Sequence, residues 1–343
     1  MLIYKLFSLK SCCWSQEEEN MMNPTQIIET FSGIFFLVYT YLRETLANWV
    51  AGCESCVKDK HLKYFVYAPD NRKPDDDAML HYQEFKFESG KSFSNVFYPE
   101  KDDVVKRLDF FSKNKEWYKK RGIPYTIGFL FYGAPGCGKT STIKAIANHT
   151  QRHIVSVPLN KIKTAKELLN VFYNVRMNYK DIPLNQRLYV LEDIDAADLK
   201  EVGFDREKTA VLLEVLDGVM EMDGRMLIIT TNYPERLDKA LIRPGRIDMK
   251  VKFGLCTADN IVQMYQHYFE TELPSSFDRS RLQDDVYSPA EVTQVFLNNM
   301  HKPEEGLEQL ASQTATNIRL EGESCPFSSS APSTPSKQQA KEE

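Results

Sequence analysis

The sequence has little that would mark a metal-binding or secreted protein. Its seven cysteines are scattered along the chain, and the one CxxC pair, Cys53 and Cys56, has no second pair to complete a zinc ribbon. Cys137 lies inside a glycine-rich turn where a disulfide would be disruptive, so the cysteines indicate a reducing compartment. The first 26 residues lack the residue order of a secretory signal and the composition of a transit peptide.

An excess of positive charge is absent as well. The net charge is −5 over 343 residues, which argues against a protein whose main task is to grip a nucleic-acid backbone. One short basic run, Lys119-Lys120-Arg121, is more typical of a solvated helix end. We therefore expect no nucleic-acid partner, although a nucleic-acid motor or loader stays an alternative.

Long apolar runs are scarce. The most apolar stretch is residues 27–42, which carries no charge between Phe31 and Leu42. A spanning helix needs about 20 apolar residues, so its length alone favours a buried or interfacial helix. The localisation therefore stays open between membrane-associated and cytoplasmic.

The remaining sequence shows two kinds of pattern. "LHYQEFKFES" alternates apolar and polar residues and predicts a small β-rich region within residues 51–100. Residues 101–120 have helical spacing. From residue 126 to 255, five apolar runs alternate with helical segments, which predicts an α/β fold with a mostly parallel sheet covered on both faces. Residues 257–302 are helical again, with Ser288 and Pro289 as a helix start.

A phosphate-binding motif stands between the first predicted core strand and the helix that follows it. It matches GxxxxGK[ST] and consists of Gly133, Ala134, Pro135, Gly136, Cys137, Gly138, Lys139 and Thr140. The glycines let several N–H groups point at one anion, and the helix adds its positive end. Lys139 supplies a charge for the β- and γ-phosphates, and the Thr140 hydroxyl is a ligand for Mg²⁺. The sequence therefore predicts ATP and Mg²⁺ as cofactors.

Two acids follow the apolar run "RLYVL". We assign Glu192 to the metal, since the acid at this strand end faces the phosphate-turn threonine in such ATPases. We assign Asp193 to the attacking water, as a general base. Asp195, two residues later, has a role as a helix cap that is at least as well supported as a chemical one.

A third set of polar residues follows "MLIITT". Asn232 ends that strand, and its amide is placed to bond the γ-phosphate or the water. Arg243 and Arg246 flank Pro244-Gly245, and arginine stabilises the charge of a transferring phosphoryl group. They lie too far along the chain to fold back on the same turn, so we predict that they serve the site of a neighbouring subunit. Taken alone, their simpler interpretation is a surface salt bridge.

The order of these motifs resembles the AAA family of ring ATPases. Phe97 to Ser141, the Glu-Asp order in "LEDIDAA" and "LLEVLDGV" are similar to one branch, the mitochondrial-type chaperones that move the folded Rieske iron–sulfur protein across the inner membrane during complex III assembly. The resemblance covers roughly residues 97–302. It implies a P-loop NTPase fold with a C-terminal helical lid, a homo-oligomeric ring of six or seven subunits, a protein substrate and possible association with the mitochondrial inner membrane.

Carried over by residue, the resemblance implies ATP at Gly133–Thr140, metal and water at Glu192 and Asp193, a γ-phosphate sensor at Asn232, and arginine fingers at Arg243 and Arg246. It also strengthens the prediction that residues 27–42 form a membrane-spanning helix. Threading members carry an aromatic-Gly pore loop where this chain has "PLNKIKTAKELLN", so we expect no grip on an unfolded polypeptide of that kind.

The leading hypothesis is an ATP-hydrolysing oligomeric AAA chaperone or translocase that remodels or moves a protein partner. A module that holds ATP without turnover is a further alternative. The expected domain order is an N-terminal segment (1–50), a small β-rich region (51–100), an AAA ATPase α/β core (101–256), a helical lid (257–320) and a disordered tail (321–343).

Overall fold

The computed structural model describes residues 61–68, 81–174, 176–178, 180–194 and 206–312, together with Arg43 and Thr45. The chain divides into two compact units, Met1–Lys60 and His61–Glu343. The features below belong to the second unit. The stretch at 27–42, the CxxC pair, Asp195 and the tail at 321–343 lie outside the described residues. Among the helices that the structure describes, none has the length and hydropathy to cross a bilayer.

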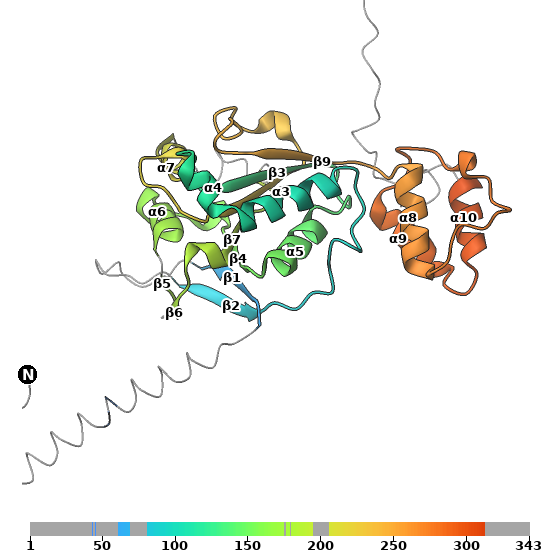
Figure 1. Ribbon diagram of the computed structural model, residues 1–343, viewed down its shortest axis with the longest axis horizontal. Helices are drawn as coiled ribbons and strands as arrows, with labels where there is room; N and C mark the ends of the chain where they lie inside the picture. Colours follow the sequence, from blue (N-terminus) through green and yellow to red (C-terminus); the bar gives the residue numbers. More distant parts are fainter. Residues whose placement is uncertain are drawn as a thin grey trace, which may run out of the picture. The chain divides into compact units, whose positions relative to one another are not determined.

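A seven-stranded sheet forms the centre of this unit, in the order β2-β1-β4-β7-β8-β3-β9 (Figure 1). Its strands are β1 (Lys63–Tyr67), β2 (Tyr82–Lys86), β3 (Ile127–Gly133), β4 (His153–Ser156), β7 (Arg187–Leu191), β8 (Met226–Thr231) and β9 (Met249–Phe253). All neighbouring pairs are parallel except β1 and β2. The five core strands predicted from the apolar runs are thereby confirmed.

The predicted β-rich region differs from the expectation, because its two described strands belong to the core sheet. β1 pairs in parallel with β4, with Tyr64 opposite Ile154. At the far edge, the side chain of Asn178, in the turn of the short hairpin β5 (Arg176–Met177) and β6 (Lys180–Asp181), accepts from the Tyr82 N–H and donates to its carbonyl. Alternation predicts strands, but the sheet that a strand joins depends on long-range pairing.

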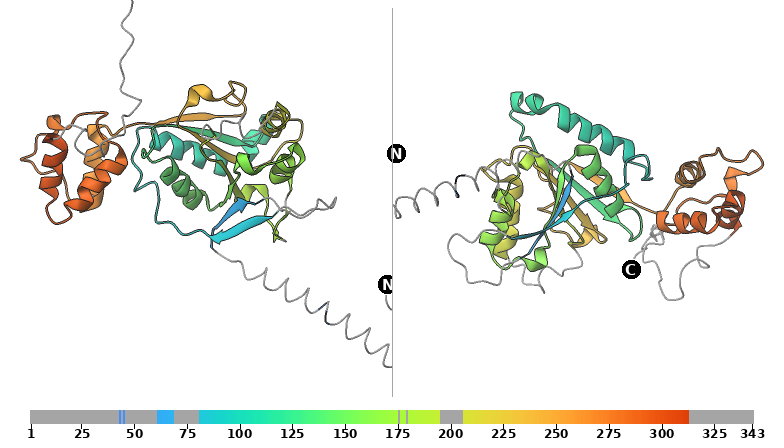
Figure 2. Two further views of the ribbon diagram at one scale, coloured as in Figure 1. Left: turned by 180° about the vertical axis from the view of Figure 1, so that it is seen from behind. Right: turned by 90° about the horizontal axis from the view of Figure 1, so that it is seen from below.

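Helices cover both faces of the sheet, as the sequence predicts (Figure 2). Alternate strand residues point to opposite faces. In β8, Leu227 and Ile229 share a hydrophobic core with α6 and α7, whereas Met226 and Ile228 share one with α3, α4 and α5. The helices are α3 (Lys101–Lys113), α4 (Lys115–Lys120), α5 (Lys139–Thr150), α6 (Ala165–Tyr173) and α7 (Arg206–Asp217). The helix expected over 101–120 is therefore two helices.

Three further helices, α8 (Ala258–Phe269), α9 (Pro289–Asn298) and α10 (Pro303–Ser312), share a hydrophobic core of their own. The predicted start of α9 is confirmed, because Ser288 and Glu291 form a reciprocal capping box with Pro289 in the first turn. These helices occupy the described part of the segment that the sequence predicts as a lid.

Candidate active site

The turn between β3 and α5 is a cradle of backbone N–H groups. Gly133, Gly136 and Gly138 have positive φ values of 136°, 76° and 98°. A β-carbon on Gly133 would lie 1.9 Å from the carbonyl oxygen of Phe253 in β9, so the turn passes this strand only without a side chain. The first turn of α5 carries no acidic residue. A helix N-terminus of this kind attracts phosphate through its N–H groups and its dipole.

The ammonium group of Lys139 joins the cradle to the end of β8. Its Nζ donates to the carbonyl oxygens of Gly133 at 2.6 Å and Ala134 at 3.0 Å, and to Oδ1 of Asn232 at 2.7 Å. The Lys139 residue is only 8% exposed. A buried ammonium group is a strong hydrogen-bond donor, and this one lies beside the place where phosphate would sit.

A cavity of about 450 Å³ opens in front of the cradle. Four of the predicted site residues outside the glycine turn line it, namely Lys139, Thr140, Asp193 and Asn232. They come from β3–α5, β7 and β8, whose carboxyl ends meet at one edge of the parallel sheet. This is the edge at which open α/β sheets bind ligands.

The backbone of Asp193 is held in an uncommon conformation. Its φ is 45°, in the left-handed region, and its N–H donates to Oγ1 of Thr230 at 2.8 Å. Thr230 is buried in the neighbouring strand β8. A constrained backbone of this kind is typical of functional sites. Thr230 was not among the predicted site residues, although a polar residue near the end of an apolar strand is the signal that could have identified it.

Glu192 lies on the other side of Thr140. It lines a second cavity, of about 350 Å³, together with Thr140 and Lys144 of α5. Loss of water around the carboxyl group, and then the charge of Asp193, raise the pKa of Glu192, while Lys144 acts in the opposite direction. Thr140 and Glu192 therefore offer two oxygen ligands in one cavity, a donor set that suits Mg²⁺ beside phosphate.

The opposite wall of the first cavity was not predicted from the sequence. It comes from the segment before α3, with Phe97 and Tyr98, and from α8 and α9, with Met264, Tyr268 and Thr293. These apolar and aromatic side chains, with few polar groups, suit the planar base of a nucleotide. The aromatic run "NVFY" was the available signal, but its role depends on helices that lie far away in the sequence.

Arg243 and Arg246 lie near the amino ends of the parallel strands, opposite the carboxyl ends where the cradle lies. A β-carbon on Gly128, near the start of β3, would lie 2.3 Å from the carbonyl oxygen of Arg246, whereas the cradle begins at Gly133. Five strand residues separate these points by about 17 Å, more than an arginine side chain spans. Neither arginine is among the described residues that line the first cavity.

The fold and this site define the class of the protein. Residues 129–255 match the family described as ATPase family associated with various cellular activities (AAA), so the chain contains an AAA domain on an α/β P-loop NTPase fold. The matched span runs from β3 to just beyond β9 and contains every predicted site residue.

Within that class, the chain is similar to the mitochondrial chaperone BCS1. It is 36% identical to human BCS1 over 216 residues, covering 59% of this chain and 50% of the relative. It is 32% identical to the probable mitochondrial chaperone bcs1 of Schizosaccharomyces pombe over 273 residues, covering 75% and 57%. It is also 30% identical over 221 residues to the protein HYPER-SENSITIVITY-RELATED 4 of Arabidopsis thaliana, covering 58% and 37%. The resemblance to the chaperone branch is confirmed. The chain spans about half the length of the two BCS1 relatives and 37% of the Arabidopsis protein.

Proposed function

We propose that this protein is an oligomeric ATPase that uses ATP hydrolysis to remodel or move a protein partner. The observation that carries the proposal is the separation of the two halves of the site. The cradle, the acids and Asn232 meet at one edge of the sheet, whereas Arg243 and Arg246 lie at the other. One protomer therefore holds the triphosphate, and the arginines complete the site of the next. Head-to-tail contacts of this kind build a ring when the rotation between neighbouring subunits closes.

Each residue has a role that follows from its place. The cradle and Lys139 bind the phosphates of ATP, and Thr140 and Glu192 would hold Mg²⁺, which neutralises phosphate charge. Asp193 accepts a proton from the attacking water, and the oxygen of that water bonds to the γ-phosphorus as the bond to the ADP oxygen breaks. Asn232 orients the γ-phosphate or the water, and arginine from the neighbour stabilises the transferring group.

The relatives supply the proposed cellular setting. Those named mitochondrial chaperones suggest a protein substrate and mitochondrial association, and we propose a homo-oligomeric ring of six or seven subunits. The chain between β4 and α6 has no aromatic residue or glycine, which supports a partner that is not gripped as an unfolded strand. The domain boundaries and a membrane helix at 27–42 remain proposals of the same kind.

A complementation experiment tests the shared site. We expect the Asp193→Asn variant to bind ATP without hydrolysing it, and Arg243→Ala to lose about 10³-fold in kcat. Mixed in equal amounts, the two inactive variants should regain activity, since about a quarter of the interfaces in random rings join an intact acid to an intact arginine. Phosphate release by the mixture measures this. Full activity of both Arg243→Ala and Arg246→Ala, or a mixture as inactive as its components, would rule out the shared site.

A further inference from the structure

The two arginines occupy different environments, although they lie on one turn. Arg243 is exposed, and within the described part of the chain its guanidinium group has no hydrogen bond, ion pair or ring contact. The Arg246 side chain is only 15% exposed. A group that must reach into another subunit needs to be free to leave its own, and only Arg243 meets this condition.

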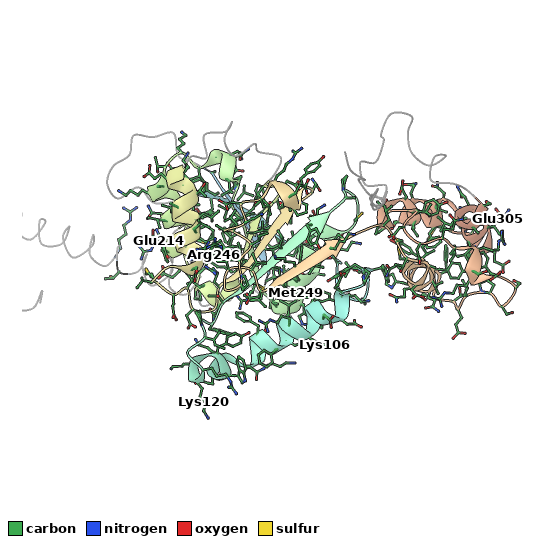
Figure 3. The ribbon with its side chains drawn as sticks, turned by 90° about the horizontal axis from the view of Figure 1, so that it is seen from above. Lys106, Lys120, Glu214, Arg246, Met249 and Glu305 are labelled. Carbon is green, nitrogen blue, oxygen red and sulfur yellow. The ribbon has the colours of Figure 1, made fainter. Side chains whose placement is uncertain are left out.

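The Arg246 side chain is bonded within its own subunit. Its Nη1 donates to the carbonyl oxygen of Ala240 at 2.6 Å, and its Nε lies 3.5 Å from Oδ2 of Asp217, at the end of α7. Figure 3 shows Arg246 between α7, where Glu214 is labelled, and the start of β9, where Met249 is labelled. To serve a neighbouring site, this guanidinium group would have to break both contacts.

The chain on either side of Arg246 is fixed to the sheet. The N–H of Asp248 donates to the carbonyl oxygen of Gly128 at 2.8 Å, and the Asp248 carboxylate accepts from the Gly128 N–H at 2.8 Å. The end of α7 is fixed as well, because the buried Arg225 guanidinium donates to the carbonyl oxygens of Val215 and Leu216. The bond from Arg246 to Ala240 therefore closes the segment 240–246 against a rigid base.

We infer that the two arginines have separate roles, an inference that rests on the proposed function. Arg243 is the catalytic residue that reaches the phosphate of the neighbouring subunit. Arg246 is a positioning residue, which closes the segment 240–246 and so presents Arg243 at its exposed tip. Asp217 pairs with Arg246 and so links the segment 240–246 to the end of α7. The start of α7 follows Glu192 and Asp193 in the sequence.

Paired substitutions in the full chain test this division. Lysine keeps the charge of arginine but not its planar, bidentate geometry. We expect Arg243→Lys to lose most of kcat, because a phosphoryl group is bound through that geometry. Arg246→Lys should recover at least about tenfold over Arg246→Ala, since one ammonium donor is enough to bond the Ala240 carbonyl and face Asp217. Arg176→Gln, at an exposed arginine in the β5–β6 hairpin, serves as the control.

The double variant gives the second measurement. If Arg246 acts only through Arg243, then Arg243→Ala/Arg246→Ala should be no slower than Arg243→Ala alone. The effects of two substitutions on kcat do not add when both residues act through the same catalytic group. Asp217→Ala should lower kcat in the same direction as Arg246→Ala, with nucleotide affinity unchanged. Single-turnover hydrolysis of radiolabelled ATP keeps these low rates measurable.

The opposite results identify Arg246 as the residue that crosses the interface. They are an active Arg243→Lys beside an inactive Arg246→Lys, a double variant that loses the product of the two single effects, or an Asp217→Ala variant that is faster than the wild type. Any of these overturns the division of roles while leaving the shared site intact. Normal hydrolysis by both single alanine variants would instead refute the shared site on which the proposed function rests.

Discussion

The bond between Lys139 and Asn232 makes a prediction about nucleotide affinity. In the structure the Lys139 ammonium donates to Oδ1 of Asn232 at 2.7 Å, across the space that phosphate would enter. When ADP binds, its phosphates compete for the same donor, so the bond to Asn232 is weakened or lost. ADP has no γ-phosphate for Asn232 to contact. ADP binding therefore reports only the competition between Asn232 and the phosphates for Lys139. We therefore expect Asn232→Ala to bind ADP more tightly than the wild type.

The size of the effect follows from the kind of bond. A hydrogen bond to a charged group contributes about 1.5–3 kcal/mol, and water entering the space left by the amide replaces part of it. A net change of about 1 kcal/mol corresponds to roughly fivefold tighter binding. Asn232→Asp is the matched opposite. A carboxylate at the same place would hold the ammonium group more strongly, so ADP should bind at least about fivefold more weakly.

Titration calorimetry with ADP at fixed Mg²⁺ measures both variants, and thermal unfolding checks that each is folded. Hydrolysis of ATP is measured separately, because Asn232 has its own proposed role in turnover. Competition between Asn232 and the phosphates is refuted if Asn232→Ala binds ADP no more tightly than the wild type, or if Asn232→Asp binds it more tightly. Either result would mean that Lys139 keeps its bond to Asn232 when the phosphates are bound.

Two further predictions concern stability. Gly133→Ala should destabilise the fold by about 3 kcal/mol or more, because its β-carbon would lie 1.9 Å from the Phe253 carbonyl oxygen. Gly254→Ala is the control, because a β-carbon built there has no atom of another segment within 4 Å. Equal urea midpoints for the two variants would contradict the predicted clash at Gly133. Burial and the charge of Asp193 raise the pKa of Glu192, so the native state holds that proton more tightly than the unfolded chain does. The resulting stability is present below the unfolded pKa and is lost as the pH rises through the folded pKa. Without nucleotide, Glu192→Gln should therefore be more stable than the wild type near neutral pH, and a gain that did not shrink towards acid pH would refute this assignment.

Short-range order in the sequence determined the phosphate cradle and the strands. The cradle needs glycines, a lysine and a threonine at fixed spacing, and its backbone comes from one turn and the start of one helix. The core strands are apolar on both faces, so their runs are visible without knowledge of their neighbours. For the same reason, the acids after β7 and Asn232 after β8 could be selected as strand-end residues.

Tertiary structure alone decided how these pieces meet. The sequence does not show that β1 joins β4, that Glu192 and Asp193 line two cavities on either side of Thr140, or that Arg246 is bonded to Ala240 while Arg243 is exposed. It also does not show that α8 and α9 supply part of the cavity wall. Each of these depends on contacts between segments far apart in the chain. Local sequence patterns do not predict the free energies of such contacts. The sequence by itself determined the chemical groups of this protein, and packing decided which of them face the same space.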